Sequence, residues 1–261
     1  MRYFRLFYIF FRVGVLSELA YRVNFFVQLF QSLVELGTAL LGLAVIFSYT
    51  NTLGSWSPDE VLALVGVYFL VGGIIGLVIQ PGMGKLIESV RDGTLDFTLA
   101  KPEDAQLLVS IQRVEIWKLI DIVLGFGVLA AALVRLGEHV EGWEALSFIV
   151  MLVAGTVIIY SFWLILAGLS FWFVRVENIL EIFQSVYEAG RWPISLYPGW
   201  MRFALTFIIP IAFVTTVPAE ALTGRLSTGT LLGATLAAVL LFAVSRVLWK
   251  IGLKQYSGTS A

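Results

Sequence analysis

Residues 81–118 read PGMGKLIESVRDGTLDFTLAKPEDAQLLVSIQRVEIWK and hold 11 of the 35 Asp, Glu, Lys and Arg residues of this 261-residue chain. Long apolar segments that carry almost no charge lie on both sides of this stretch. Apolar residues make up 59% of the chain and charged residues only 13%, about half the usual share of a soluble domain. A soluble protein of this size needs more charge to cover its surface. We therefore predict a membrane protein in which residues 81–118 form a charged cytoplasmic loop.

The apolar segments around that loop predict an all-α, polytopic membrane protein with six transmembrane helices. A bilayer core needs about 20 apolar residues per helix. The predicted spans are residues 25–49, 61–80, 117–136, 145–173, 179–197 and 231–249. A further apolar stretch, residues 201–218, is broken by Pro210 and ends at Pro218. Because backbone groups freed by proline must be satisfied within protein, we predict a re-entrant segment before the last span, with a seventh, kinked span as the alternative.

The placement of Lys and Arg predicts the orientation of these spans, because cytoplasmic loops carry an excess of both. With six spans and the N-terminus inside, 13 Lys and Arg residues fall on cytoplasmic segments and 3 on outer ones. A seventh span would move the basic residues of the C-terminal segment outside, which favours the re-entrant interpretation. We expect a multi-pass protein of the cell inner (plasma) membrane, with a transmembrane domain over residues 25–249 and a cytoplasmic tail over residues 250–261.

Residues 1–24 precede the first span and could be mistaken for a signal peptide. Arg5 and Arg12 interrupt the apolar run, however, and no small-residue cleavage site follows. Together with Arg2 they fall on one side of a helix whose remaining residues are Phe, Tyr, Leu and Ile. This pattern predicts an N-terminal helix that lies in the cytoplasmic interface.

Composition excludes several classes of function. The chain has no cysteine, so disulfides, thiolate metal sites and cysteine nucleophiles are excluded, and its one histidine, His139, cannot form a multi-histidine metal site. The formal net charge of −1 gives no reason to expect a nucleic-acid partner. The sequence contains no Gly-x-x-x-x-Gly-Lys-Ser/Thr phosphate loop. We therefore expect no cofactor in this chain, and a chain that is not itself an enzyme.

The charged loop contains a helical pattern. Its apolar residues follow the i, i+3, i+4, i+7 spacing of one helix face, with charged residues on the opposite face, and Gly93 is a natural stop. Pro102, Glu103 and Asp104 are typical of the first turn of another helix. A solvated linker with a surface helix is the alternative interpretation.

Three motifs carry a resemblance to a known family. The string ESVRDGTLD at residues 88–96, followed by LAKP at residues 99–102, resembles the cytoplasmic loop of ABC-2-type transporter permeases. The pair RWPISLYP at residues 191–198 and IPIAFVTTVPA at residues 209–219 is similar to the branch described as uncharacterised ABC transport permeases. The string YRVNF at residues 21–25 fits the same branch. The resemblance covers residues 15 to 250, approximately.

This resemblance implies a transporter built from two permeases of six spans each, identical or paralogous, and two separate cytoplasmic ABC ATPase subunits that bind ATP and magnesium. It also implies a coupling helix that docks into the ATPase. In this sequence the coupling role would fall on Met83, Leu86, Ile87, Glu88, Val90, Arg91, Asp92, Gly93, Thr94, Leu95 and Asp96.

A second group of polar residues lies within the predicted spans. On the fifth span Glu177, Glu181, Gln184, Glu188, Arg191 and Ser195 recur at steps of 4 and 3, so they share one helix face. Glu35 lies near the middle of the first span. Ionisable groups are expensive in hydrocarbon, so these side chains should face the bundle interior, a cavity or a partner.

The resemblance places the first and fifth spans beside the pathway between permeases, which makes Glu35, Glu181, Gln184, Glu188 and Arg191 candidate path residues. The alternatives are a structural role, with Glu35 paired to Arg191, and proton coupling. Asp121, one turn inside the third span, is expected to reach cytoplasmic water.

Three functions follow from this sequence. The first is the permease subunit of an ATP-driven exporter of a lipid-like, amphipathic or saccharide cargo. The second is a proton-coupled secondary transporter, which would need no ATPase and should show inverted repeats. The third is a membrane-embedded enzyme, for which no catalytic set of side chains is visible.

Overall fold

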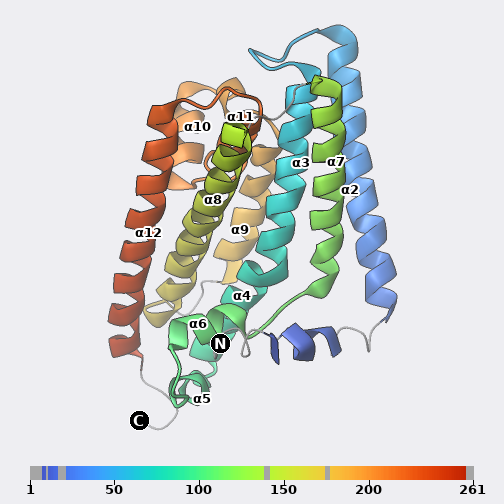
Figure 1. The fold of residues 1–261 in the computed structure, drawn as a ribbon. Helices are drawn as coiled ribbons and strands as arrows, with labels where there is room; N and C mark the ends of the chain where they lie inside the picture. The colour runs from blue at the N-terminus through green and yellow to red at the C-terminus, as the bar shows by residue number, and fades with distance from the viewer. Residues whose placement is uncertain (1–7, 10, 17–21, 138–141, 174–176, 257–261) are drawn as a thin grey trace.

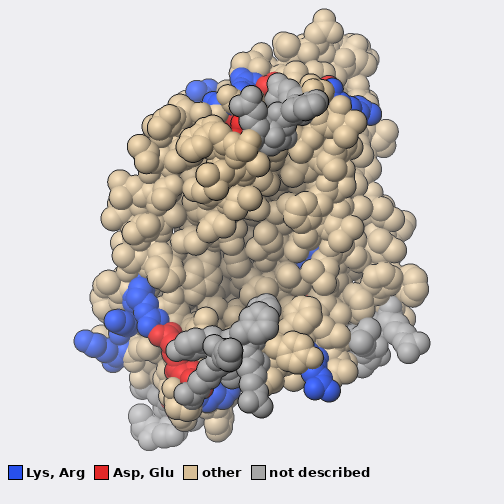
Figure 2. Space-filling model, in the orientation of Figure 1, with Lys and Arg blue, Asp and Glu red and all other residues tan. Residues whose placement is uncertain are grey.

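The computed structural model describes residues 8–9, 11–16, 22–137, 142–173 and 177–256, and these are helical apart from connecting turns and one isolated bridge between Leu53 and Trp56 (Figure 1). Five helices are long and apolar enough to cross a membrane: Val23–Tyr49, Pro58–Arg91, Ile116–Leu136, Gly142–Phe171 and Thr228–Gln255. They correspond to five of the six predicted spans. Charged residues on the face shown in Figure 2 gather at the two ends of the molecule, with an almost uncharged band between them. Both findings support a multi-pass membrane protein.

The long helices run between two ends of the bundle (Figure 1). Helix α12 (Thr228–Gln255) ends at one end of the bundle, beside the short helices α5 (Asp96–Leu99) and α6 (Ala105–Ile111). The loop from α2 (Arg22–Tyr49) to α3 (Pro58–Ile74) lies at the opposite end, as do α10 (Gly199–Phe203) and α11 (Thr216–Leu222). Residues 8–9 and 11–16 form helix at the end that carries α5 and α6, within the stretch where the sequence predicts the interfacial helix.

Helix α3 lies at the centre of the core. Its residues from Val61 to Val71 are almost all buried, as expected of a helix that is apolar all round. It packs against α7 (Leu119–Leu136) where Gly66 and Gly125 let the two backbones approach. A separate cluster of buried apolar side chains joins α8 (Gly142–Gly168) to α11 and to α12 (Thr228–Gln255).

The predicted span 179–197 is wrong as a continuous helix. Helix α9 ends at Tyr187 after 11 residues, and a 3₁₀ turn, Glu188–Arg191, follows. Trp192 then takes an extended conformation, with φ −113° and ψ 148°. The physical reason is Pro193, because the residue before a proline is pushed out of the helical region.

The stretch predicted to be re-entrant is broken where the sequence suggests. Helix α10 continues as a π-helical segment to Ile208, and Ile209, before Pro210, is extended. The chain resumes as α11, whose residues are mostly buried against α8 and α3. Neither α10 with its π-helical extension nor α11 is long enough to span a bilayer. The re-entrant course of residues 201–218 through the membrane stays a prediction.

Candidate functional site

A cavity of about 340 Å³ lies where α2, α3, α7 and α9 meet. Its polar lining comes from segments far apart in the sequence: Glu35, Tyr68, Gln80, Lys118, Asp121, Gln184, Tyr187, Glu188 and Arg191. Apolar side chains, including Phe183 and Trp163, complete the wall. The volume falls within the range of small-molecule sites. Four of the five predicted path residues therefore meet at one cavity.

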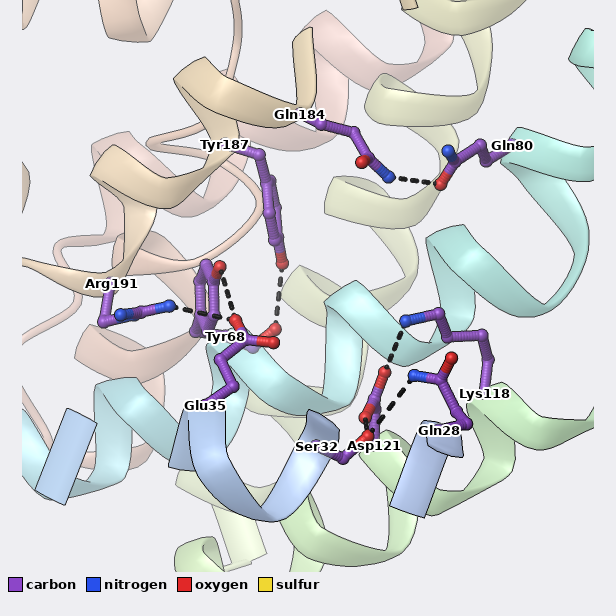
Figure 3. A network of polar contacts seen from close by, with 10 residues as sticks. All are labelled: Gln28, Ser32, Glu35, Tyr68, Gln80, Lys118, Asp121, Gln184, Tyr187 and Arg191. Carbon is purple, nitrogen blue, oxygen red and sulfur yellow. Dashed lines mark hydrogen bonds and ion pairs between the residues drawn. The ribbon is translucent and has the colours of Figure 1, made fainter. Parts of the chain in front are cut away.

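Glu35 and Arg191 form an ion pair across this cavity (Figure 3). The Arg191 guanidinium donates to Glu35 Oε1 at 2.9 Å, and the Tyr68 hydroxyl donates to the same oxygen at 3.4 Å. The guanidinium also lies over the Tyr68 ring, 5.2 Å from its centre, a distance typical of a cation–π contact. The pairing that the sequence suggested as the structural alternative is thus present.

Two stacked tyrosines hold this pair in place. The rings of Tyr68 and Tyr187 lie 4.8 Å apart at 20°, and the Tyr187 hydroxyl donates to the Tyr68 carbonyl at 2.9 Å. Tyr187 packs against α3 beside Gly72, where even an added Cβ would lie 3.4 Å from the tyrosine ring, an ordinary van der Waals contact. Sequence reasoning missed both tyrosines, since an apolar stretch gives no sign of which aromatic residue carries a hydrogen bond.

The opposite wall of the cavity holds a second ion pair (Figure 3). Lys118 Nζ lies 3.1 Å from Asp121 Oδ2, and the Ser32 hydroxyl donates to Asp121 Oδ1 at 2.5 Å. Asp121 is 6% exposed, so the expectation that it reaches cytoplasmic water is wrong. Ser32 on α2 and Lys118 before α7 thus each contact a different oxygen of the Asp121 carboxylate. Sequence reasoning missed Ser32, because its partner lies 89 residues away on another helix.

The polar stripe of α9 divides between the cavity and the outside. Gln184 lines the cavity and donates to Gln80 Oε1 at 2.6 Å, and Glu188 lines it with an exposed side chain. Glu181 is exposed and does not line it. The side chain of Glu177 lies outside the described residues. The ionisable groups of the lining are three carboxylates and two cations, and because two carboxylates are paired, Glu188 supplies the surplus negative charge.

The segment predicted to couple to an ATPase is a direct continuation of α3. A π-helical turn, Ile75–Ile79, joins α3 to α4 (Gln80–Arg91), which ends before Gly93 at φ 68° as predicted. The helix predicted to start at Pro102 is α6, which begins three residues later, at Ala105, because Asp104 acts as its N-cap by accepting from Leu107 N at 3.2 Å.

The apolar face of α4 is covered by the chain itself. Met83 and Leu86 are 0% exposed and Ile87 3%, because α6, α8 and α9 pack over them. Leu95 is also buried, whereas Glu88, Val90, Gly93 and Asp96 are half-buried. The predicted coupling residues that remain exposed are Arg91, Asp92 and Thr94. The sequence pattern identified a real helix face but not what covers it.

A polar network anchors the region of α4–α6 to the long helices. The Arg246 guanidinium on α12 bonds to both carboxylate oxygens of Asp104 and donates to Gln106 Oε1 at 2.7 Å. Gln106 in turn donates to the Tyr160 hydroxyl on α8 at 3.1 Å. The hydrogen bond from Arg246 lowers the pKa of the Asp104 carboxyl, so this anchor stays charged at neutral pH.

Comparison with known proteins gives one match. No curated protein matches the chain. The family described as "ABC-2 family transporter protein" matches residues 33–260, which include the cavity, the segment α4–α6 and the broken hairpin. That match agrees with the resemblance carried by the cytoplasmic loop and the proline-rich pairs. The chain belongs to the ABC-2 transporter family.

Proposed function

We propose that this chain is the permease subunit of an ATP-driven exporter in the cell inner membrane. Separate cytoplasmic ATPase subunits would bind ATP and magnesium, and this chain would supply no enzymatic activity. The observation that carries the proposal is the cavity with the Glu35–Arg191 pair, set among long apolar helices of an ABC-2 family chain. Charged groups persist in such a setting where they meet water, cargo or a partner.

The polar residues on the outer faces of α2 and α9 support a second permease. Gln31 and Glu35 on α2, Glu181 and Gln184 on α9, and Glu188 on the 3₁₀ turn that follows α9 all have exposed side chains. In a bilayer these groups would meet hydrocarbon, where a charged side chain at the centre of a span costs about 2.5–3.5 kcal/mol or more. A second copy, or a paralogue, would cover them and extend the cavity between the two subunits.

The dimensions of the cavity favour a cargo with a small polar head and an apolar remainder. A space of about 340 Å³ holds a lipid headgroup or a single sugar ring, but not an entire lipid. Exposed apolar residues on the same two helices, such as Phe30 on α2 and Ile182 on α9, offer a surface for an acyl chain. We infer that the cargo is lipid-like or amphipathic, with a head that the carboxylate of Glu188 can bind.

Replacement of Glu188 by glutamine tests the cavity as the cargo path. It removes the surplus charge while keeping the shape, and hydrogen bonds to charged groups contribute about 1.5–3 kcal/mol. We expect at least about a tenfold weaker stimulation of ATP hydrolysis by lipid extract in the reconstituted complex, with unchanged assembly. Glu181→Gln, on the same helix but outside the cavity, is the matched control. Lower yield with unchanged stimulation would show that Glu188 is structural.

The orientation of the chain can be tested with introduced cysteines, because the chain has none of its own. Thr228 and Gln255 lie at the two ends of α12 and both are exposed. With the termini in the cytoplasm, an impermeant thiol reagent added to intact cells should label Thr228→Cys and should label Gln255→Cys only after permeabilisation. The reverse pattern would overturn the proposed topology.

A further inference from the structure

We propose that Lys118, Asp121 and Ser32 are positioning residues that transmit movement of α4 to the Glu35–Arg191 pair. This link rests on the proposed function, in which an ATPase moves the cytoplasmic end of α4. It consists of contacts in series from the π-helical turn Ile75–Ile79 to α7 and then to α2.

The link begins at a backbone carbonyl that a proline leaves free. In a regular helix the N–H of residue 81 would donate to the carbonyl of Leu77, four residues earlier. Pro81 has no N–H, and its ring disfavours the regular helix at this point, where the chain forms the π-helical turn. The free Leu77 oxygen accepts instead from Glu115 N at 2.9 Å, in the segment that leads into α7.

Residues 115–118, which lead into α7, also pack against the π-helical turn. Lys118 N donates to Glu115 O at 3.1 Å, which closes a turn between them. The aliphatic stem of Lys118 covers Gly76, where an added Cβ would lie 2.9 Å from Lys118 Cγ and Cδ. A shift of α4 about the π-helical turn therefore moves Lys118 directly.

Asp121 passes this movement to α2. Its carboxylate is bonded to Lys118 Nζ at 3.1 Å and to the Ser32 hydroxyl at 2.5 Å (Figure 3). Both Asp121 and Ser32 are buried, at 6% and 1% exposure, so neither can exchange its partner for bulk water without cost. Ser32 lies one helical turn from Glu35, which holds Arg191 across the cavity. Displacement of Ser32 along α2 thus changes the distance between Glu35 and Arg191.

The test follows two environment-sensitive fluorophores in the complex with its ATPase. One is attached at Arg91→Cys, at the exposed end of α4, and the other at Gln31→Cys, on the exposed face of α2. ATP, magnesium and vanadate are added to trap the closed ATPase. We expect both probes to respond in the otherwise unchanged chain. With Ser32→Ala or Asp121→Asn, the response at position 91 should persist and that at position 31 should be lost, and Ser32→Thr, which retains the hydroxyl, should restore it.

Pro81→Ala separates transmission from stability. Alanine supplies the missing N–H, so Leu77 O can bond within its own helix and release Glu115. We expect a melting temperature and ATPase co-purification no lower than those of the unchanged chain, together with a reduced response at position 31. A purely structural role for this contact predicts no change in that response.

Each outcome decides between the two proposals. No response at position 91 in the unchanged chain would contradict the coupling role of α4 and hence the proposed function. A response at position 91 without one at position 31 would overturn the link alone. Equal responses at position 31 in the unchanged chain, Ser32→Ala and Pro81→Ala would also overturn it, even if Asp121→Asn failed to fold.

Discussion

Replacement of Gly125 by valine is expected to prevent α3 and α7 from packing and to abolish accumulation of the folded chain. A Cβ at Gly125 would lie 2.5 Å from Leu70 N and 2.8 Å from both Leu70 Cα and Gly66 O. These are backbone atoms of α3, which belongs to the most buried of the five long helices, so they cannot move aside as the end of a side chain can. Overpacking of a core typically lowers the stability of a protein by about 1–3 kcal/mol. Where two backbones cross, we expect a loss of stability at or above the upper end of that range.

Gly127→Val is the matched control for this prediction. Gly127 is on the same helix, two residues away, and has no atom within 4 Å of an added Cβ. Detergent-solubilised yield and melting temperature should therefore fall for Gly125→Val and remain near those of the unchanged chain for Gly127→Val. Equal losses would mean that general helix propensity, rather than the close approach of α3 and α7, determines the effect.

Replacement of Phe97 by serine is expected to release the ATPase. Phe97 is 76% exposed on α5, which lies beyond α6 at the end of the bundle where α12 finishes (Figure 1). Leu95, two residues earlier, is fully buried and fixes this part of the chain, whereas the aromatic ring of Phe97 points outward. Burial of a phenylalanine contributes about 1.5–3 kcal/mol. Loss of that contact should weaken the complex roughly 10- to 100-fold.

The control for Phe97 is Phe203, which is 58% exposed on α10 at the opposite end of the molecule. Titration of purified ATPase onto the permease in nanodiscs gives the two dissociation constants. We expect Phe203→Ser to bind as the unchanged chain does. Wild-type affinity for Phe97→Ser would remove this ring from the docking surface. Leu86 and Ile87 do not suit the same test, because both are buried within the chain and their replacement would disturb its own core.

The apolar runs predicted most of the architecture, because a bilayer imposes a minimum length on each apolar helix. The fifth span failed for local reasons: residues 179–197 include three charged residues, Glu181, Glu188 and Arg191, and Pro193 ends the helical course at Arg191. The apolar face of α4 was visible in the sequence as a periodic pattern. Periodicity shows that a face is buried but not which element buries it, and here α6, α8 and α9 do so.

The cavity was predictable only where charge stood out from its surroundings. Glu35, Glu188 and Arg191 are conspicuous in apolar segments, and the sequence suggested that the first and last of these pair. Tyr68, Tyr187 and Ser32 are not conspicuous, because such residues are common in helices of this kind. Their roles depend on which helices are neighbours, and that arrangement is set by packing at Gly66 and Gly125 rather than by any local motif.

The unbroken course of the chain from Pro58 to Arg91 makes this segment a lever. Its 34 residues span about 50 Å, against roughly 30 Å for the hydrocarbon core of a bilayer. The π-helical turn, Ile75–Ile79, would be the pivot of this lever. It separates a longer arm, α3, from a shorter arm, α4, which is about 18 Å long. A rotation of about 10° at the pivot displaces the end of that shorter arm by about 3 Å, the length of one hydrogen bond. A displacement of this size at the end of α4 would thus change the angle at the π-helical turn, where Gly76 and the adjacent Gln80 line the cavity.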